Sequence, residues 1–231
     1  MSSEPAPTVV EVPEYFYSVD VNYLTHMIGD MLSRLISHND LIPLTPSNLT
    51  RFHSRASPGI TVSEYLRRIV KYTSVEKACL LILLIYIDRV CERHPSFTIS
   101  SLTVHRFLIT AVTVSSKALC DSYCTNSHYA KVGGISTQEL NTLELEFLTL
   151  IDWHLGGSGV TLQRYYVNLV KQHPCYKRAR GTNIEYGDSV VGGRGTAMLD
   201  EAAAQVEDGT DEETTRHFDT LLDDERIPYI A

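Results

Sequence analysis

The sequence feature that most constrains the fold is an unbroken apolar run at residues 78–87. The pattern continues through Asp88 and Arg89 to Cys91, which is helical length, whereas a buried strand, the competing assignment, is shorter. A helix that is apolar on every side has to be buried by neighbours on all sides. A membrane span needs ~20 apolar residues, about twice this run. The run therefore predicts a central helix over about residues 75–94 inside a helical bundle, and no membrane span.

Six further helices are predicted from apolar residues that recur every three or four positions. Two of them open with capping boxes, in which a Ser or Thr is followed three residues later by Glu. No alternation of period two, which would indicate strands, occurs between residues 18 and 174. The fold class is therefore predicted to be all-α, with helices that begin at or near Asp20, Thr61, Ser100 or Ser101, Asn126, Ser136 and Thr161.

Proline content and charge divide the chain into three expected parts: an extension over residues 1–17, a helical domain over 18–174, and an acidic, Gly-rich, disordered tail over 175–231. Residues 181–231 hold thirteen Asp and Glu and three Lys and Arg, so their net charge is −10. The other residues have a net charge of +2, which gives the overall net charge of −8. A nearly neutral domain argues against nucleic acid as a partner, because that affinity rests on phosphate neutralisation.

The compartment is indicated by the five cysteines and by the first residues of the chain. The cysteines are odd in number and irregular in spacing, which is typical of reduced thiols. The acidic, Pro-rich start lacks the pattern of a secretory signal. We expect a soluble protein of the nucleus or cytoplasm. The basic cluster at residues 177–180 is a weak candidate for a nuclear-import signal.

Motifs for catalysis or for a bound cofactor are weak throughout. Cys120, Cys124 and His128 lack the fourth, paired ligand of a structural zinc site. The glycine clusters at residues 156–159 and 192–195 lack the Lys-Ser/Thr ending and the strand–helix context of a phosphate-binding loop. No strained nucleophile motif such as G-x-S-x-G is present. The sequence therefore predicts no enzymatic activity, no metal and no cofactor.

A polar stripe on the helix that ends near Cys120 is the strongest functional signal. Lys117 lies in this stripe, on a mostly apolar helix, where a charge requires a partner. Glu144 on the next long helix is the candidate partner. Two interpretations stay open: the pair joins two helices of the bundle, or it lines a groove in which it offers donors and an acceptor to the backbone of a docked partner helix.

Six segments between the third predicted helix and the sixth form a recognisable pattern. They are residues 86–89 (YIDR), 105–110 (HRFLIT), 116–121 (SKALCD), 125–135 (TNSHYAKVGGI), 139–144 (ELNTLE) and 147–148 (FL). These segments resemble the cyclin box, and more narrowly the phosphate-regulon (P-type or U-type) cyclins of fungi and protists. The similarity runs from about residue 60 to residue 173, and the stretch Asn126–Gly134, which reads NSHYAKVGG, is the most specific.

The resemblance implies a single five-helix cyclin box, with one flanking helix before it and one after it. It also implies the role of a regulatory, non-catalytic subunit in a heterodimer with a cyclin-dependent protein kinase. In the family, a Lys and a Glu contact the backbone around the kinase's PSTAIRE-like helix, in a groove between the third and fifth box helices. The positions that the resemblance assigns to this contact are Lys117 and Glu144, flanked by Val114, Ala118 and Leu148, with Trp153 at the rim and Asp121 toward the kinase activation segment.

The sequence also departs from the cell-cycle cyclins. Residues 64–69 lack the M-R-A-I-L-type patch with which those cyclins dock RxL substrates, so this docking mode is not expected. A second cyclin box and a destruction box are not evident. A kinase-independent helix-binding scaffold and a cyclin-fold transcription-factor module remain as alternatives. The identity of the kinase, its substrates, the choice between cell-cycle and nutrient signalling, and the role of the tail are not specified by the sequence.

Overall fold

A computed structural model describes residues 9–179 of the chain, which divides into two units, residues 1–178 and 179–231. The described part contains seven α-helices and two three-residue strands, so the prediction of an all-α fold is confirmed. The expected arrangement of five helices with one flanking helix on each side corresponds to α2–α6, preceded by α1 and followed by α7. The helices are α1 (Val21–Asn39), α2 (Val62–Thr73), α3 (Lys77–Arg93), α4 (Val104–Leu119), α5 (Asn126–Gly133), α6 (Thr137–Leu150) and α7 (Gly159–Gln172).

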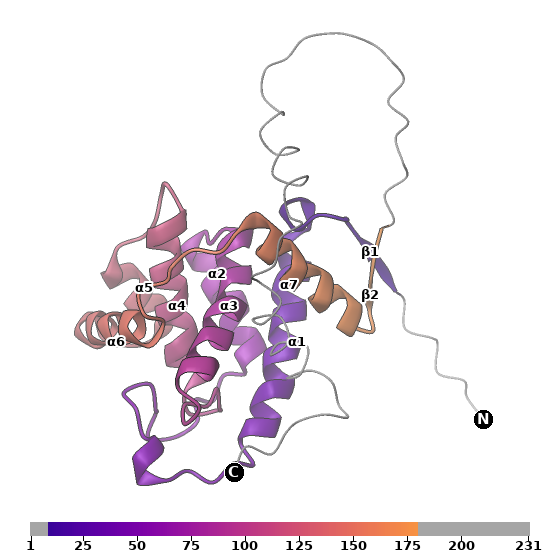
Figure 1. The fold of residues 1–231 in the computed structure, drawn as a ribbon. Coiled ribbons are helices and arrows are strands. Elements are labelled where there is room, and N and C mark those ends of the chain that lie inside the picture. Colours follow the sequence, from indigo (N-terminus) through magenta and orange to yellow (C-terminus); the bar gives the residue numbers. More distant parts are fainter. Residues whose placement is uncertain (1–8, 180–231) are drawn as a thin grey trace, which may run out of the picture. The chain divides into compact units, whose positions relative to one another are not determined.

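The apolar run begins at the second residue of α3 and extends over more than half of this helix, which lies at the centre of the bundle (Figure 1). Every residue from Cys79 to Asp88 is buried, as a helix that is apolar all round requires. Helices α4, α7 and α1 all contact α3. None of the helices in residues 9–179 has the length and apolar character needed to cross a bilayer. The central-helix prediction is therefore confirmed.

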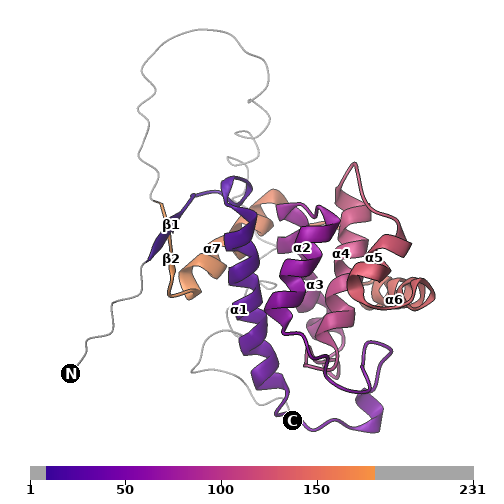
Figure 2. The same ribbon diagram turned by 180° about the vertical axis from the view of Figure 1, so that it is seen from behind.

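The remaining elements lie on either side of α3. Figures 1 and 2 show α4, α5 and α6 on one side and α1 and α7 on the other. Helix α4 packs against α6 and α5, and α1 packs against α2. Rings from the loop before α2 and from three helices meet where α3, α4 and α6 converge, with centroids 5.2–6.4 Å apart; they are Phe52, Tyr86, Phe107 and Phe147.

Most helix starts follow the sequence signals. The Asp20 side chain accepts a hydrogen bond from the Asn22 backbone N–H, and the Thr61–Glu64 capping box is complete. The second expected box is half formed: Ser136 caps α6, but the Glu139 carboxylate binds Arg106 instead of reaching back. An ion pair with a neighbouring helix thus replaces a local hydrogen bond.

The start of α4 differs from the sequence expectation. The helix begins at Val104, after a turn in which the Thr103 hydroxyl accepts a hydrogen bond from the Ser100 backbone N–H. Thr103 is completely buried. A buried hydroxyl thus provides the hydrogen bond that holds this turn. Ser100 and Ser101, where the sequence predicted the helix to begin, lie before its first residue.

The strands β1 (Val10–Val12) and β2 (Tyr176–Arg178) pair in parallel and join the two ends of the described chain. The expected division at residues 17 and 174 did not anticipate this pairing, because three residues are too few to show an alternating pattern. Residues 177 and 178 of the basic cluster lie exposed in β2. Most of the acidic tail, and with it the expectation of disorder, falls outside the described residues.

Candidate partner-binding site

Lys117 and Glu144 lie together, as the sequence predicted. The Lys117 ammonium Nζ is 2.6 Å from the Glu144 carboxylate Oε1. The second carboxylate oxygen accepts a hydrogen bond of 2.8 Å from the Asn126 amide, which also donates to the Asn141 side-chain oxygen. The Lys117 side chain is 32% exposed and the Glu144 side chain 15%. The pair is thus accessible from solvent and is not sealed in the core.

The polar stripe on α4 explains how the pair is positioned. At the start of α4, the Arg106 guanidinium contacts Glu139 of α6 at 2.6 Å. Along the middle, Thr110 and Thr113 are buried and their hydroxyls donate to carbonyls one turn back. Only the two ends of the stripe therefore need partners on another helix, and α6 supplies both. The Lys117–Glu144 pair is the end that faces α5.

The other predicted site residues differ in their exposure to solvent. Val114 is 3% exposed, so it supports the surface from beneath. Ala118 is exposed and Leu148 is half-buried, so both can contribute apolar contact area. Asp121 is exposed in the loop that follows α4. Trp153 is 63% exposed, with a left-handed backbone (φ 60°) just beyond α6.

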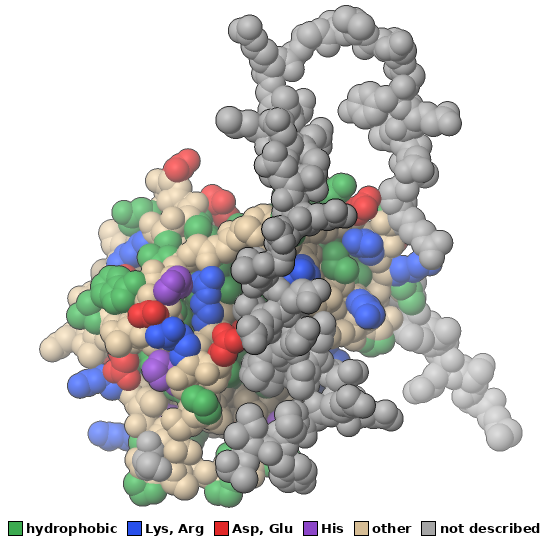
Figure 3. Space-filling model, viewed as in Figure 1, with side chains coloured by type: hydrophobic (Ala, Val, Ile, Leu, Met, Phe, Trp, Pro, Cys, Tyr) green, Lys and Arg blue, Asp and Glu red, His purple; other side chains and the backbone are tan. Residues whose placement is uncertain are grey.

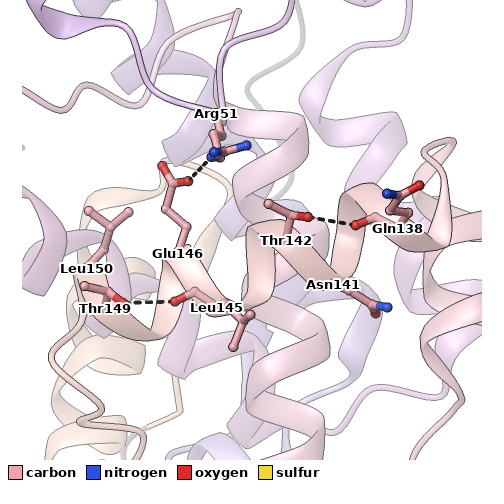
Figure 4. A pocket seen from close by; sticks show the side chains of 8 residues that line it. All are labelled: Arg51, Gln138, Asn141, Thr142, Leu145, Glu146, Thr149 and Leu150. Atoms are coloured by element: carbon pink, nitrogen blue, oxygen red, sulfur yellow. Dashed lines mark hydrogen bonds and ion pairs between the residues drawn. The ribbon is translucent and has the colours of Figure 1, made fainter.

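A hollow on the outer face of α6 was not predicted from the sequence. It has a volume of about 540 Å³. Figure 4 shows the side chains of α6 around it, with Arg51 bonded to Glu146 across one edge at 3.1 Å. Leu145 lies at its margin and is 64% exposed. The sequence carried one signal for this surface, because Leu145 falls off the apolar stripe of α6 that faces the core.

The side of the molecule that carries α4–α6 is mixed in character. Figure 3 shows hydrophobic side chains there among basic and acidic ones, with no large area of a single charge. Interfaces between proteins commonly combine an apolar centre with polar groups at the rim. This surface is therefore suited to a protein partner rather than to a polyanion.

Cys124 and His128, two of the three residues with the chemistry of zinc ligands, make other contacts. The Cys124 thiol faces the Thr73 carbonyl at 3.9 Å, and the His128 ring bonds the Tyr72 carbonyl at 2.6 Å. Both groups thus satisfy carbonyls at the C-terminal end of α2, which a helix end leaves free.

A different group of potential metal ligands, His26, Asp30 and His173, is present among the described residues. His173 Nδ1 accepts from the Cys175 backbone N–H at 3.2 Å, so its proton is on Nε2, 2.9 Å from the Asp30 carboxylate. The Tyr176 hydroxyl is 2.7 Å from His26 Nδ1. Through these contacts the cluster joins α1 to the chain after α7.

Comparison with known proteins identifies the class of protein to which this helical arrangement belongs. The family model for cyclins, described as "Cyclin", matches residues 24–155, more than half of the chain. The chain therefore belongs to the cyclin family, and the resemblance seen in the sequence is confirmed.

The relatives belong to the P-type and U-type group that the sequence indicated. The chain is 48% identical over 159 residues to the Nuc-1 negative regulatory protein preg of Neurospora crassa, an alignment that covers 68% of this chain and 33% of the relative. It is 42% identical to the PHO85 cyclin PHO80 of Saccharomyces cerevisiae, covering 64% of this chain and 52% of the relative. It is 40% identical to Cyclin-U4-1 of Arabidopsis thaliana, covering 64% and 75%. The chain thus spans a third to a half of the length of the two fungal relatives.

Proposed function

We propose that this chain is the regulatory subunit of a cyclin-dependent protein kinase and that it holds the kinase's PSTAIRE-like helix in a groove between α4 and α6. Membership of the cyclin family supports the general role. The name of the yeast relative, a PHO85 cyclin, supports a kinase of that type as the partner. The five free cysteines support a nuclear or cytoplasmic site of action.

The observation that carries the proposal is that the Lys117–Glu144 ion pair is partly exposed to solvent. A lysine ammonium has three N–H donors, and the contact with Glu144 uses one of them. Backbone carbonyls at the end of a partner helix lack donors of their own. Lys117 supplies donors for such carbonyls, Glu144 holds Lys117 in place, and Ala118 and Leu148 provide apolar contact beside them. Asp121 and Trp153 are both exposed, as residues at the rim of such a contact need to be.

The proposed mechanism is a shift of the kinase's conformational population. A regulatory subunit activates a kinase when it binds the active conformation more tightly than the inactive one. In protein kinases the active conformation needs a helix glutamate paired with the catalytic lysine. Binding to the kinase helix that carries this glutamate therefore stabilises the conformation in which the glutamate and the catalytic lysine are paired. All bond-making stays with the kinase, and this chain acts through binding alone.

The first test is Lys117→Ala, assayed by co-purification with a PHO85-type kinase and by phosphorylation of a peptide substrate. We expect binding to be lost while far-UV helicity is kept. The free energy of unfolding should fall by no more than about 1 kcal/mol, because the pair is partly exposed. Asn126 still donates to Glu144 after the change, so no buried charge is left without a partner. Arg67→Ala, an exposed change on α2, serves as the control and should bind normally.

Exchanging the two charged residues distinguishes a pair that binds the partner from a pair that only joins α4 to α6. The double variant Lys117→Glu with Glu144→Lys keeps an ion pair between α4 and α6 but reverses what each position offers to a partner. Under the proposal this variant folds and does not bind the kinase. Normal kinase binding by the exchanged variant, or by Lys117→Ala, would show that the pair only joins the two helices.

A further inference from the structure

Two cysteine thiols meet beside the proposed groove. Cys79 on α3 and Cys120 at the end of α4 have their Sγ atoms 3.2 Å apart. Cys79 is completely buried and Cys120 is 9% exposed. A disulfide bond is about 2.05 Å long, so the two sulfurs need to approach by only about 1.2 Å to be joined. The pair comes from residues 41 positions apart and was not predicted from the spacing of the cysteines.

We propose that Cys79 and Cys120 form a reversible disulfide when the protein meets a peroxide oxidant, and that this bond controls the end of α4 that carries Lys117. The first part concerns this chain alone. The second part rests on the proposed function, because Lys117 precedes Cys120 by three residues and Asp121 follows it directly.

The chemistry proceeds in two balanced steps with hydrogen peroxide as the oxidant. Cys120, the more exposed of the two thiols, attacks one peroxide oxygen; the O–O bond breaks, the leaving hydroxide takes the Cys120 thiol proton and departs as water, and Cys120 becomes a sulfenic acid. The Cys79 sulfur then attacks the Cys120 sulfur. The S–O bond breaks, the S–S bond forms, and the hydroxyl leaves as water with the proton from Cys79. Two thiols are oxidised and one peroxide is reduced to two waters.

The environments of the two thiols suit this division of roles. Burial, together with the neighbouring Cys120, raises the pKa of the Cys79 thiol to about 12. Cys79 therefore stays protonated and is a poor first target, since the thiolate is the reactive form. Cys79 lies within 3.2 Å of Cys120, so it can attack the oxidised sulfur while its proton passes directly to the leaving hydroxyl, and no free thiolate is needed.

The other cysteines lack such a partner at this distance in the described residues. Cys124 bonds a backbone carbonyl, and burial raises the pKa of Cys91 to about 12. Cys175 lies at the junction between α7 and β2, where its backbone carbonyl accepts from Val10. The disulfide is thus expected to form at this one pair, whichever other thiols the oxidant also reaches.

The disulfide would act on the groove through the end of α4. The Cys120 backbone N–H donates to the Ser116 carbonyl and closes the helix. Drawing the Cys120 sulfur toward α3 therefore moves the last turn, which includes Lys117. We expect the oxidised chain to bind the kinase at least tenfold more weakly, and a thiol reductant to restore binding.

The first experiment uses the full chain without kinase. The protein is treated with a small excess of hydrogen peroxide, alkylated, digested with trypsin and analysed by mass spectrometry. The proposal predicts a loss of two hydrogen atoms from the intact mass and a reducible cross-link between peptides 78–89 and 118–131. Because the second peptide contains both Cys120 and Cys124, Cys124→Ala is the matched control and should retain the cross-link.

Cys79→Ala and Cys120→Ala should each abolish the cross-link. If either variant fails to fold, the peptide map of the unaltered chain, with Cys124→Ala as its control, still decides the matter. A disulfide that joins a different pair of cysteines, or the absence of any cross-link after peroxide treatment, would overturn the proposal.

The second experiment tests the coupling to the groove. The chain is oxidised, freed of peroxide, and only then mixed with the kinase, so that the kinase is never exposed to the oxidant. Binding should weaken for the unaltered chain and stay unchanged for Cys79→Ala. A disulfide that forms without altering binding would refute the coupling alone. Kinase binding that survives Lys117→Ala would refute the proposed function and leave the peptide map valid.

Discussion

Asp88 is the residue whose chemistry is most altered by the fold. It lies in the apolar middle of α3, 1% exposed, and accepts a hydrogen bond from the Tyr165 hydroxyl of α7. Burial raises the pKa of the Asp88 carboxyl to about 7, and the charge of Glu92 adds to this, while the Tyr165 hydrogen bond opposes it. The carboxyl therefore holds its proton in the folded state at pH values where an unfolded chain has released it.

This difference predicts a pH-dependent stability. Between about pH 4 and pH 7 the folded state binds one proton more than the unfolded state at Asp88, so its contribution to the free energy of unfolding falls as pH rises. The decline is up to about 1.4 kcal/mol per pH unit. Asp88→Asn cannot ionise, and we expect its stability relative to the unaltered protein to increase from pH 5 to pH 7.5, measured by urea unfolding.

The comparison is made as a difference because other groups titrate in the same range. Burial lowers the pKa of His53 and His105, and their contributions run in the opposite direction. They cancel between two proteins that differ only at Asp88. A stability difference for Asp88→Asn that stays constant from pH 5 to pH 7.5 would refute the raised pKa of Asp88.

At the scale of the elements, the contact between α4 and α5 depends on a residue without a side chain. A Cβ atom added at Gly133, the last residue of α5, would lie 2.7 Å from the buried Ile109 side chain of α4. Gly134, which follows, has φ 72°, the left-handed conformation that ends helices. The two glycines at the end of this helix thus differ in function: Gly133 permits close packing, and Gly134 provides the turn.

Gly133→Ala is therefore expected to destabilise the domain. Ile109 is completely buried and has little room to move, so overpacking should cost about 1–3 kcal/mol. Gly59→Ala is the matched control, because a Cβ there meets nothing within 4 Å. The measurement is the midpoint of thermal or urea unfolding. Equal midpoints for the two variants would mean that α5 can shift away from α4 at no cost.

At the scale of the whole described unit, the segments at its two ends, residues 10–12 and 176–178, pair with each other, and the first of them leads into a segment bonded to the bundle. Strand β1 pairs with β2, and the Tyr166 hydroxyl of α7 donates to the Pro13 carbonyl at 2.6 Å. Gln163 of α7 bonds the backbone at Glu14 and Phe16. The N-terminal segment thus closes over α7 and contributes to the stability of the domain.

Two valines at the N-terminal end test this contribution. Val12 is 1% exposed and Val9 is 52% exposed. Val12→Ser should lower the free energy of unfolding by about 2 kcal/mol, because it removes a buried apolar side chain. Val9→Ser should change it by no more than about 0.5 kcal/mol. Unfolding by urea measures both, and an unchanged stability for Val12→Ser would show that β1 is not fastened to the domain.

The sequence by itself determined which segments are helical, which helix is central and which charged residues need each other. These properties are local or periodic: the all-round apolar run dictated the burial of α3, and a lysine on an apolar helix required an acid such as Glu144. The resemblance to cyclins extended this reading to a family, which the comparisons confirmed.

The tertiary structure alone decided which distant groups meet. The 3.2 Å approach of Cys79 and Cys120, the ion pair that takes Glu139 from its capping box, and the pairing of β1 with β2 all join segments far apart in the chain. No local pattern encodes such contacts, because they arise from how whole helices pack. The exposure of Lys117 and Glu144 has the same origin, since the packing of α4, α5 and α6 fixes how much of each side chain solvent can reach.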